Sequence, residues 1–382
     1  MKPALLLYCQ HSVGLGHLMR SYALSAALAE RFRVVLLCGG AVPDGIRPPA
    51  GVRVVALPPL GIGAGGRFVS HDPRYTLEAA WAARHARILA TFRALRPAAV
   101  VVELFPFGRA KFARELVPLL EAARSAGALT ACSVRDILVS RRADQQEHDD
   151  RAARHADALL DAVLVHSDPS FARLEETFAP RRPLRVPVHY TGFVVREPSA
   201  APDGRGEHVL VSSGGGLVGE PLLRAAALAQ PAAGVPMRLI AGPLLPDEAY
   251  ERLTALAGPG VELRRTVQDL GAELRGARAS ISQGGYNTAL EVVRSGVPAL
   301  IVPYETPEED EQVRRSARLE RLGAARVLRA ARLGELAGEL PRLLRFTPAR
   351  APVALDGAPR TGALLEQLLD RRAVPAARTG SA

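Results

Sequence analysis

The feature that most limits the fold of this chain is a regular alternation of short apolar runs with longer amphipathic stretches. In the first half, the apolar runs Ala4–Cys9, Val34–Cys38 and Ala99–Val102 are each followed by turn residues or a helix-like segment. The second half restarts the pattern at His208–Val211 and Met237–Ala241. Strands that alternate with helices are typical of βαβ units. We therefore expect an α/β protein built from two similar units in tandem, each around a parallel sheet.

A polar segment, EPSAAPDGRGE at Glu197–Glu207, separates the two halves and is proline-bearing and short, as interdomain linkers are. The glycine-rich stretch Pro58–Asp72 predicts a long mobile loop within the first half. The predicted organisation is a first domain at 1–197, a linker at 198–206, a second domain at 207–372 and a disordered tail at 373–382.

Composition limits the partners and the compartment. The 382 residues are 48% hydrophobic and 23% charged, as in a folded globular chain, and no apolar run approaches the roughly 18 residues that span a bilayer. The net charge of +10 favours anionic partners such as nucleotides or lipid phosphates. Scattered basic residues without aromatic neighbours argue against nucleic acid. Three isolated cysteines fit a reducing cytoplasm, so we expect a cytoplasmic protein, with peripheral contact at the inner membrane face left open.

The first chemical motif is GLGHLMR, which begins at Gly14 and follows the first strand. Gly14 and Gly16 let the backbone approach a ligand, and the helix that follows offers free N–H groups. The sixth position of a dinucleotide fingerprint is Met19 here, which disfavours a nicotinamide or flavin site. His17 at the helix start is our candidate general base, with His11 as a weaker second candidate. The alternative is a helix-capping or structural histidine.

Two further glycine motifs stand in the second half. SSGGG, Ser212–Gly216, directly follows a strand and suits a diphosphate cradle made of backbone amides and serine hydroxyls; a plain tight turn is the alternative. SQGGYNTALE places Gly284–Gly285 before a helix and Glu291 about a turn further along. A carboxylate there can accept both hydroxyls of a ribose. The acidic run that ends at Glu311 starts a helix, and Glu311 and Gln312 are predicted to face the ligand.

Polar residues also follow strands of the first half. Glu103 and Arg109 lie in ELFPFGRAKF, and Arg135 and Asp136 lie in SVRDILVS. Ligands of parallel sheets bind at the carboxyl ends of strands, so these residues are candidates for the acceptor side. Structural ion pairs are an equally good explanation. The sequence has no DxD triplet and no metal-ligand spacing of His or Cys, so we expect no catalytic metal.

Together, GLGHLMR, ELFPFGR, SVRDILV, SSGGG and SQGGYNTALE resemble a bacterial family of predicted GT-B glycosyltransferases related to the peptidoglycan (lipid II-forming) N-acetylglucosaminyltransferase, with a glycosyltransferase family 28-like C-terminal domain. The likeness spans residues 4 to about 330. It implies two Rossmann-like domains that bind a nucleotide-sugar in the cleft, with no cofactor. Glu291 would hold the ribose, backbone near Val267 the base, Glu311 and Gln312 the sugar hydroxyls, and His17 would face the acceptor. The implied donor-site set is Gly14, Gly16, Ser212, Ser213, Gly214, Gly215, Val267, Gln283, Gly284, Gly285, Asn287, Thr288, Glu291, Glu311 and Gln312.

The same resemblance predicts the stereochemistry. Retaining members tend to carry a Glu-x7-Glu pair, but Ala299 and Val313 stand eight residues beyond Glu291 and Glu305, which favours inversion. We expect a metal-independent inverting glycosyltransferase that moves a sugar from a UDP-sugar to a hydroxyl acceptor. The identity of the acceptor is unknown, and the classes left open are a polysaccharide, a lipid-linked molecule and a small molecule. GLGH-xx-R also resembles the UDP-sugar hydrolases of pseudaminic acid biosynthesis. A hydrolase, a nucleotide-sugar 2-epimerase and a non-catalytic UDP-sugar sensor are the alternatives.

Overall fold

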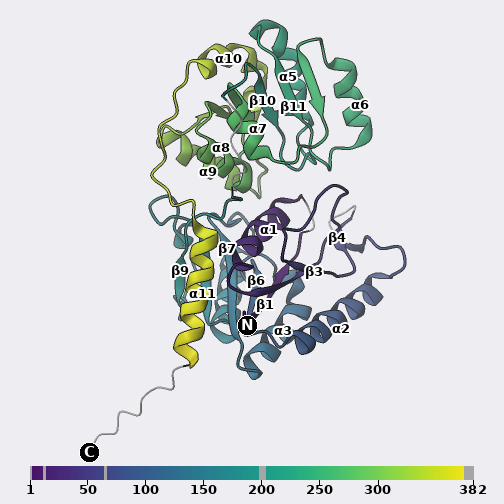
Figure 1. The fold of residues 1–382 in the computed structure, drawn as a ribbon, viewed down its shortest axis with the longest axis vertical. Helices are drawn as coiled ribbons and strands as arrows, with labels where there is room; N and C mark the ends of the chain where they lie inside the picture. Colours follow the sequence, from purple (N-terminus) through teal and green to yellow (C-terminus); the bar gives the residue numbers. More distant parts are fainter. Residues whose placement is uncertain (1, 12–13, 64–66, 198–203, 374–382) are drawn as a thin grey trace, which may run out of the picture.

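The computed structural model describes residues 2–11, 14–63, 67–197 and 204–373, which form two α/β units stacked one on the other (Figure 1). Each unit is built on a parallel sheet. The first sheet has the order β3 (Arg53–Ala56), β2 (Arg33–Cys38), β1 (Ala4–Cys9), β6 (Ala99–Glu103), β7 (Leu129–Arg135), β8 (Ala162–His166), β9 (Val188–Tyr190). The second has the order β12 (Val261–Arg264), β11 (Met237–Ile240), β10 (Val209–Ser212), β13 (Ala279–Ser282), β14 (Ala299–Ile301), β15 (Arg326–Val327). The expected α/β class with parallel sheets is confirmed.

Both sheets begin in the middle and grow outwards in both directions, so the strand order reverses at β1/β6 and at β10/β13. A crevice forms at such a reversal, because the loops that follow the two central strands leave toward opposite faces. The predicted motif GLGHLMR follows β1, and SSGGG and SQGG follow β10 and β13. The topology therefore puts the glycine motifs at the two switch points.

The helices connect the strands and cover the sheets. The first unit contains α1 (Gly16–Leu28), α2 (Leu77–Leu95), α3 (Ala113–Ser125) and α4 (Gln145–Leu159). The second contains α5 (Glu220–Ala233), α6 (Asp247–Leu256), α7 (Leu270–Gly276), α8 (Tyr286–Ser295), α9 (Glu311–Arg321) and α10 (Leu336–Leu344). No helix among the described residues is long and apolar enough to cross a membrane.

The last helix, α11 (Gly357–Ala373), leaves the second unit and packs beside α1 of the first (Figure 1). Its Leu365 is buried in the same apolar cluster as Leu18 and Leu28 of α1, and Arg31 forms an ion pair with Glu366. The predicted second domain at 207–372 did not include this return of the chain. The domain division otherwise stays a prediction, since most of the expected linker and all but residue 373 of the expected tail lie outside the described residues.

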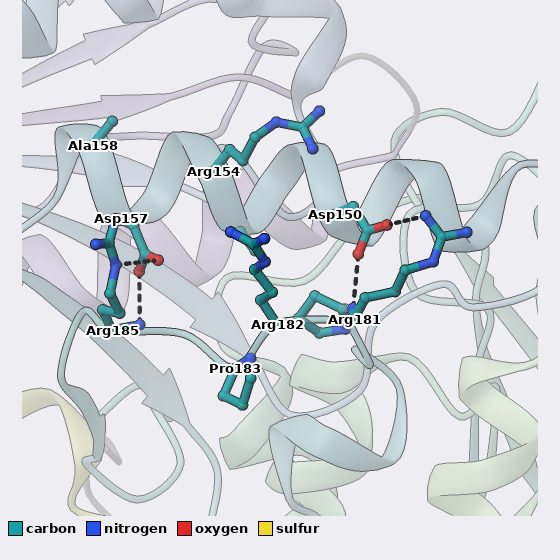
Figure 2. Close-up of a pocket in the computed structure, with 10 residues that line it drawn as sticks. Asp150, Arg154, Asp157, Ala158, Arg181, Arg182, Pro183 and Arg185 are labelled. Carbon is teal, nitrogen blue, oxygen red and sulfur yellow. Dashed lines mark hydrogen bonds and ion pairs between the residues drawn. The ribbon is translucent and has the colours of Figure 1, made fainter.

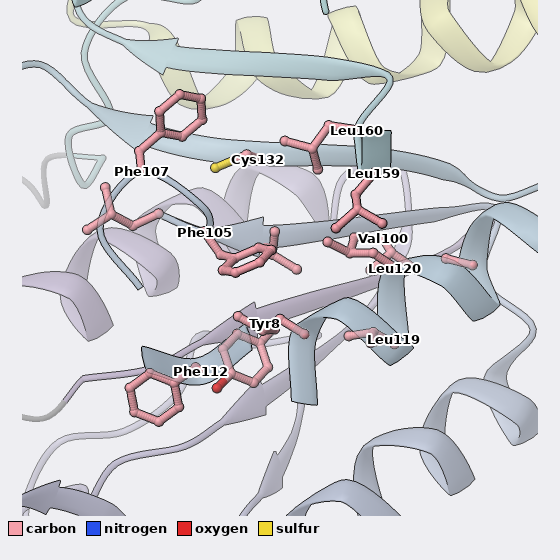
Figure 3. Close-up of a cluster of buried hydrophobic side chains, with 14 of the residues drawn as sticks. Tyr8, Val100, Phe105, Phe107, Phe112, Leu119, Leu120, Cys132, Leu159 and Leu160 are labelled. Atoms are coloured by element: carbon pink, nitrogen blue, oxygen red, sulfur yellow. The ribbon is translucent and has the colours of Figure 1, made fainter. Parts of the chain in front are cut away.

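The stretch Pro58–Asp72, expected as a loop, contains a hairpin of β4 (Leu60–Ile62) and β5 (Phe68–Ser70). The expectation of a loop was wrong for these strands, because Phe68 packs against hydrophobic residues that are distant in sequence. The glycine-rich residues around Phe68 do not indicate such contacts. Its ring packs edge-on against Trp81 and Phe112, 5.8 and 5.2 Å between centroids. Phe112 belongs to the large cluster between the first sheet and α2–α4, part of which is drawn in Figure 3.

Candidate functional site

The glycine motifs of the two units meet. A Cβ atom built on Gly215 would lie 3.7 Å from the Leu15 amide nitrogen and 3.9 Å from Gly14 Cα. Nearby, Asn287 Nδ2 at the start of α8 donates a hydrogen bond to the Gly16 carbonyl, at 2.9 Å. The loop after β1 thus touches both the loop after β10 and the helix after β13, which brings together three motifs that the sequence places far apart.

His17 lies in the first turn of α1, and its Nδ1 is 2.7 Å from Oε1 of Glu103 at the end of β6. A carboxylate can only accept, so Nδ1 carries the proton and Nε2 keeps its lone pair. None of the described residues bonds to Nε2, and the His17 side chain is 15% exposed. The arrangement is a carboxylate–imidazole dyad whose basic nitrogen is open to a ligand.

Glu103 is buried and gathers cations around it. Arg20 donates to the same Oε1 that His17 uses, and Arg109 Nε is 3.8 Å from Oε2. Burial alone raises the pKa of this carboxyl group, but the charges of its neighbours more than offset burial and hold the pKa of Glu103 below its usual range. Leu104, next in the chain, has φ of 63°, a left-handed conformation that is costly for a residue with a side chain. The turn directs the chain from Glu103 toward Arg109.

The imidazole of His17 is neutral near pH 7. Burial lowers its pKa to about 3, and Arg109 and Arg135 act in the same direction, while Glu103 opposes them. His17 is therefore in the protonation state that a general base needs. His11, the second candidate, is buried with Nε2 2.9 Å from the Ala41 carbonyl, and burial lowers its pKa. It has no hydrogen bond to the dyad among the described residues.

The SSGGG loop is shaped by its backbone. Gly214 and Gly216 have φ of 64° and 93°, which favours glycine, and the Gly214 amide donates to Ser212 Oγ at 3.3 Å. Ser213 Oγ donates to the Ala241 carbonyl at 2.6 Å. The Ser213 proton is thus already used inside the protein, which corrects the expectation that both hydroxyls face a diphosphate. The Gly214 and Gly216 amides are also bonded, to Ser212 Oγ and the Ser213 carbonyl, so the Gly215 amide and the Ser212 hydroxyl proton are the donors for which the described residues provide no acceptor.

The SQGGYNT segment packs beside that loop. A Cβ on Gly214 would lie 3.9 Å from Thr288 Oγ1, so the buried Thr288 of α8 adjoins the loop. Gly285 is the N-cap of α8 and has open space where a Cβ would stand, whereas a Cβ on Gly284 would lie 2.5 Å from Ser316 Oγ. Gln283 Nε2 donates to the Val218 carbonyl at 3.2 Å. The open amino end of α8 can therefore accept an anion beside the glycine loop.

Glu291 lies on α8, and its carboxylate points to the start of α7. A Cβ built on Gly271 would be 2.4 Å from Glu291 Oε2, so glycine is the residue that leaves room for it. Burial, together with the nearby Asp269 carboxylate, raises the pKa of Glu291 to about 7. Val267 packs against the apolar cluster that contains Leu290 of the same helix. The two residues predicted for ribose and base are thus on adjacent elements.

Glu311 and Gln312 are not free for sugar hydroxyls in this structure. Glu311 forms an ion pair with Arg135 of the first unit, 3.0 Å from Nη1 to Oε1, and Gln312 Oε1 accepts from the Tyr304 amide at 3.1 Å. Asp136 takes two hydrogen bonds of 2.8 Å from Arg315. The interpretation of Arg135 and Asp136 as members of structural ion pairs is the one that the geometry favours.

Three residues of the site region were missed from the sequence. Arg20 forms an ion pair with Glu103, and Arg315 forms one with Asp136. Both arginines also lie over the ring of Tyr286, with their Cζ atoms 5.4 and 5.6 Å from its centroid. The Tyr286 hydroxyl donates to the His166 carbonyl and accepts from the Val194 amide, both at 3.0 Å. Arg20 closes the GLGHLMR motif and Tyr286 follows Gly-Gly, so position within the motifs was the available signal.

A hollow of about 500 Å³ lies elsewhere, between α4 and residues 180–185 (Figure 2). Its Asp150 and Asp157 bind Arg181 and Arg185, and none of the predicted site residues lines it. Among the described residues, no group of three or more His, Cys, Asp or Glu side chains is placed to hold a metal ion.

Comparisons with solved structures define the class by fold. The chain aligns with Phytolacca americana UGT2, complexed with UDP-2fluoro-glucose and pterostilbene, over 100% of its length and 97% of that chain, with a TM-score of 0.60 and 17% identity. It aligns with Acinetobacter baumannii MurG over 96% and 100%, with a TM-score of 0.57 and 18% identity. The chain has the GT-B fold, two Rossmann-like units, as expected.

Sequence comparisons place part of the chain more closely. Residues 247–354 match the glycosyltransferase family 28 C-terminal domain. An 83-residue stretch is 36% identical to the UDP-N-acetylglucosamine--N-acetylmuramyl-(pentapeptide) pyrophosphoryl-undecaprenol N-acetylglucosamine transferase of Thermotoga maritima, and covers 22% of this chain and 24% of that protein. The chain thus spans about a quarter of the length of the curated relatives it matches. The match of residues 247–354 to the family 28 C-terminal domain bears out the resemblance for that part of the second unit.

Proposed function

We propose that this protein is a glycosyltransferase that moves a sugar from a nucleotide-sugar, a UDP-sugar, to an acceptor hydroxyl, with inversion and without a metal ion. The observation that carries the proposal is the His17–Glu103 dyad, in which none of the described residues bonds to Nε2 of His17. The carbonyl of the preceding residue, Gly16, accepts a hydrogen bond from Asn287 of the second unit. The residue that precedes the proposed base is thereby bonded to the start of α8. The match to the family 28 domain and the UDP-sugars named for the similar proteins favour this class of donor.

In the proposed reaction, Nε2 of His17 removes the proton of the acceptor hydroxyl as its oxygen bonds to the anomeric carbon. Glu103 fixes the ring through Nδ1 and stabilises the imidazolium as it forms. The bond between the anomeric carbon and the diphosphate oxygen breaks, and the electron pair leaves with the diphosphate. His17 then releases its proton to solvent.

The second unit would hold the leaving group. The Gly215 amide, the Ser212 hydroxyl and the amino end of α8 at Gly285 would offer hydrogen-bond donors to the diphosphate, and the positive end of the helix dipole would stabilise charge as it develops there. Glu291 would accept the ribose hydroxyls when it is ionised. These groups would supply the neutralisation that a divalent cation supplies elsewhere.

The test is a panel of UDP-sugars incubated with the protein, with and without a mixture of hydroxyl acceptors, followed by measurement of UDP and free sugar. Transfer predicts UDP release that depends on the acceptor and is insensitive to EDTA. Fast release of free sugar from the donor alone would assign the same dyad to water and make the protein a hydrolase. Absence of UDP binding to the wild-type protein would contradict both.

A further inference from the structure

Arg109 is a nearly buried guanidinium without a hydrogen bond to any residue that the structure describes. Its side chain is 17% exposed, and its closest acidic atom, Glu103 Oε2, is 3.8 Å away, beyond hydrogen-bond distance. Its Nε and Glu103 Oε2 are both buried without a partner. Arginine keeps its charge in proteins, and buried polar groups are nearly always hydrogen-bonded. We therefore expect this guanidinium to bind a group of a ligand.

The local charges do not balance without such a partner. Glu103 carries one negative charge and already bonds Arg20 and His17 through Oε1. His17 is neutral near pH 7, so Arg20 and Arg109 together leave one positive charge uncompensated. The neighbouring cations differ in this respect, since Arg135 pairs with Glu311 and Arg315 pairs with Asp136.

The position of Arg109 puts the excess positive charge beside the dyad. Arg109 directly precedes the short helical turn Ala110–Phe112, in the segment that leaves β6 after Glu103. Its charge acts on both His11 and His17, whose pKa values it helps to lower. The guanidinium is therefore on the first unit, beside the proposed base, whereas the glycine loop and α8, which would bind the diphosphate, belong to the second unit.

We propose that Arg109 binds an oxyanion of the acceptor, so that the acceptor is a hydroxyl compound that also carries a carboxylate or a phosphate group. The planar guanidinium can take such a group in a bidentate manner and set the distance from its hydroxyl to His17 Nε2. This inference rests on the proposed function and adds the substrate class. The donor's diphosphate has the same chemistry as an acceptor phosphate, so the experiment must separate the two sources.

The experiment measures binding by calorimetry with the full chain saturated with UDP. The probes are matched pairs, glucuronate against glucose and glycerol 3-phosphate against glycerol. The wild-type protein should bind a charged member of a pair and show no measurable binding of its neutral counterpart. Arg109→Gln should weaken that binding about tenfold or more, because a charged hydrogen-bond partner is lost. Arg109→Lys, which keeps the charge but loses the fork, should fall between the two.

Arg114→Gln is the matched control, since Arg114 is an exposed arginine that pairs with Glu78 on the outer side of the same unit; it should bind the probes like the wild type. Equal binding of charged and neutral probes by the wild-type protein, or unchanged binding in Arg109→Gln, would overturn the inference. A loss of affinity for UDP itself in Arg109→Gln would assign the cation to the donor's diphosphate instead. If Arg109→Gln does not fold, Arg109→Lys decides alone: binding of the charged probes as tight as in the wild type would contradict the bidentate role. Failure of the proposed function would look different, because the wild-type protein would then not bind UDP.

Discussion

Replacing Glu291 by glutamine should stabilise the protein above neutral pH and weaken its binding of UDP. Burial and Asp269 raise the pKa of this carboxyl group from 4.5 to about 7. Between these two values the folded protein keeps the proton that the unfolded chain has lost. The folded state then binds more protons, so the contribution of Glu291 to the free energy of unfolding falls as pH rises from about 4.5 to about 7 and is constant above that.

The size of the effect follows from the size of the shift. A shift from 4.5 to about 7 corresponds to an upper limit on the order of 3–4 kcal/mol of unfolding free energy. The amide of Glu291→Gln has the shape of the protonated carboxyl group and does not titrate. The variant and the wild type should therefore be about equally stable near pH 4.5, and the variant should be more stable near pH 8 by up to that amount.

Binding should change in the opposite direction. An ionised Glu291 can accept two ribose hydroxyls, which offsets the cost of keeping its charge in a desolvated place, whereas an amide oxygen accepts less strongly. We expect the variant to lose about 1.5–3 kcal/mol of UDP binding near pH 8, the usual contribution of a charged hydrogen-bond partner. The difference should shrink toward about pH 5, where the wild-type side chain is protonated.

Urea unfolding and UDP calorimetry at several pH values measure both effects. Glu308→Gln is the control, because Glu308 is an exposed glutamate of the same unit, and it should shift neither curve. A stability difference between Glu291→Gln and wild type that does not change with pH would refute the linkage argument. UDP affinity that is the same in both proteins near pH 8 would refute the ribose assignment.

Three more outcomes are expected. His17→Gln should lower kcat by about a hundredfold or more with UDP affinity unchanged. The wild-type pH–rate profile should lack an acid limb near the usual pKa of histidine, because burial lowers the pKa of His17 to about 3. Initial rates of UDP release measure both effects, and a near-normal kcat in His17→Gln would exclude His17 as the base. Asp136→Asn should destabilise the fold by about 3–5 kcal/mol in urea unfolding, since it leaves Arg315 buried without its carboxylate, and Asp136→Leu combined with Arg315→Met should recover most of the loss. Tyr286→Phe should cost about 1–3 kcal/mol, from two lost hydrogen bonds between the units, and equal stability would show that they contribute nothing.

The strand–helix alternation carried the fold prediction because apolar periodicity records local structure directly. It predicted the parallel sheets but not the hairpin of β4 and β5, where Leu60 and Phe68 are held by distant partners. It also did not predict that α11 returns to the first unit. The apolar face of α11 marks it as a packed helix, yet nothing in its spacing says that Leu365 will meet Leu18 and not the second sheet.

The same difference between local patterns and long-range contacts applies to the candidate site. His17 and Glu291 could be proposed because glycines and a helix start mark them locally. The partner of His17 is Glu103, 86 residues further along, and Asp136 and Arg315 are 179 residues apart. Strand ends of one sheet share an edge, so Glu103 was a candidate for the right region, but its pairing with His17 depends on β1 and β6 being neighbours. Glu311 was predicted to face the sugar because the sequence does not show that it meets Arg135, which belongs to the other unit.

Tyr286 connects the two halves of the proposed chemistry. Its ring contacts both Arg20, which bonds the Glu103 of the dyad, and Arg315, which bonds Asp136, while its backbone starts the helix that would receive the diphosphate. The proposed base and the helix proposed to bind the donor are therefore both linked to this buried ring, and we expect neither to shift far without moving it. Loss of the ring in Tyr286→Leu should consequently lower kcat more than it weakens UDP binding, whereas a ring that only fills space would leave kcat unchanged in the folded variant.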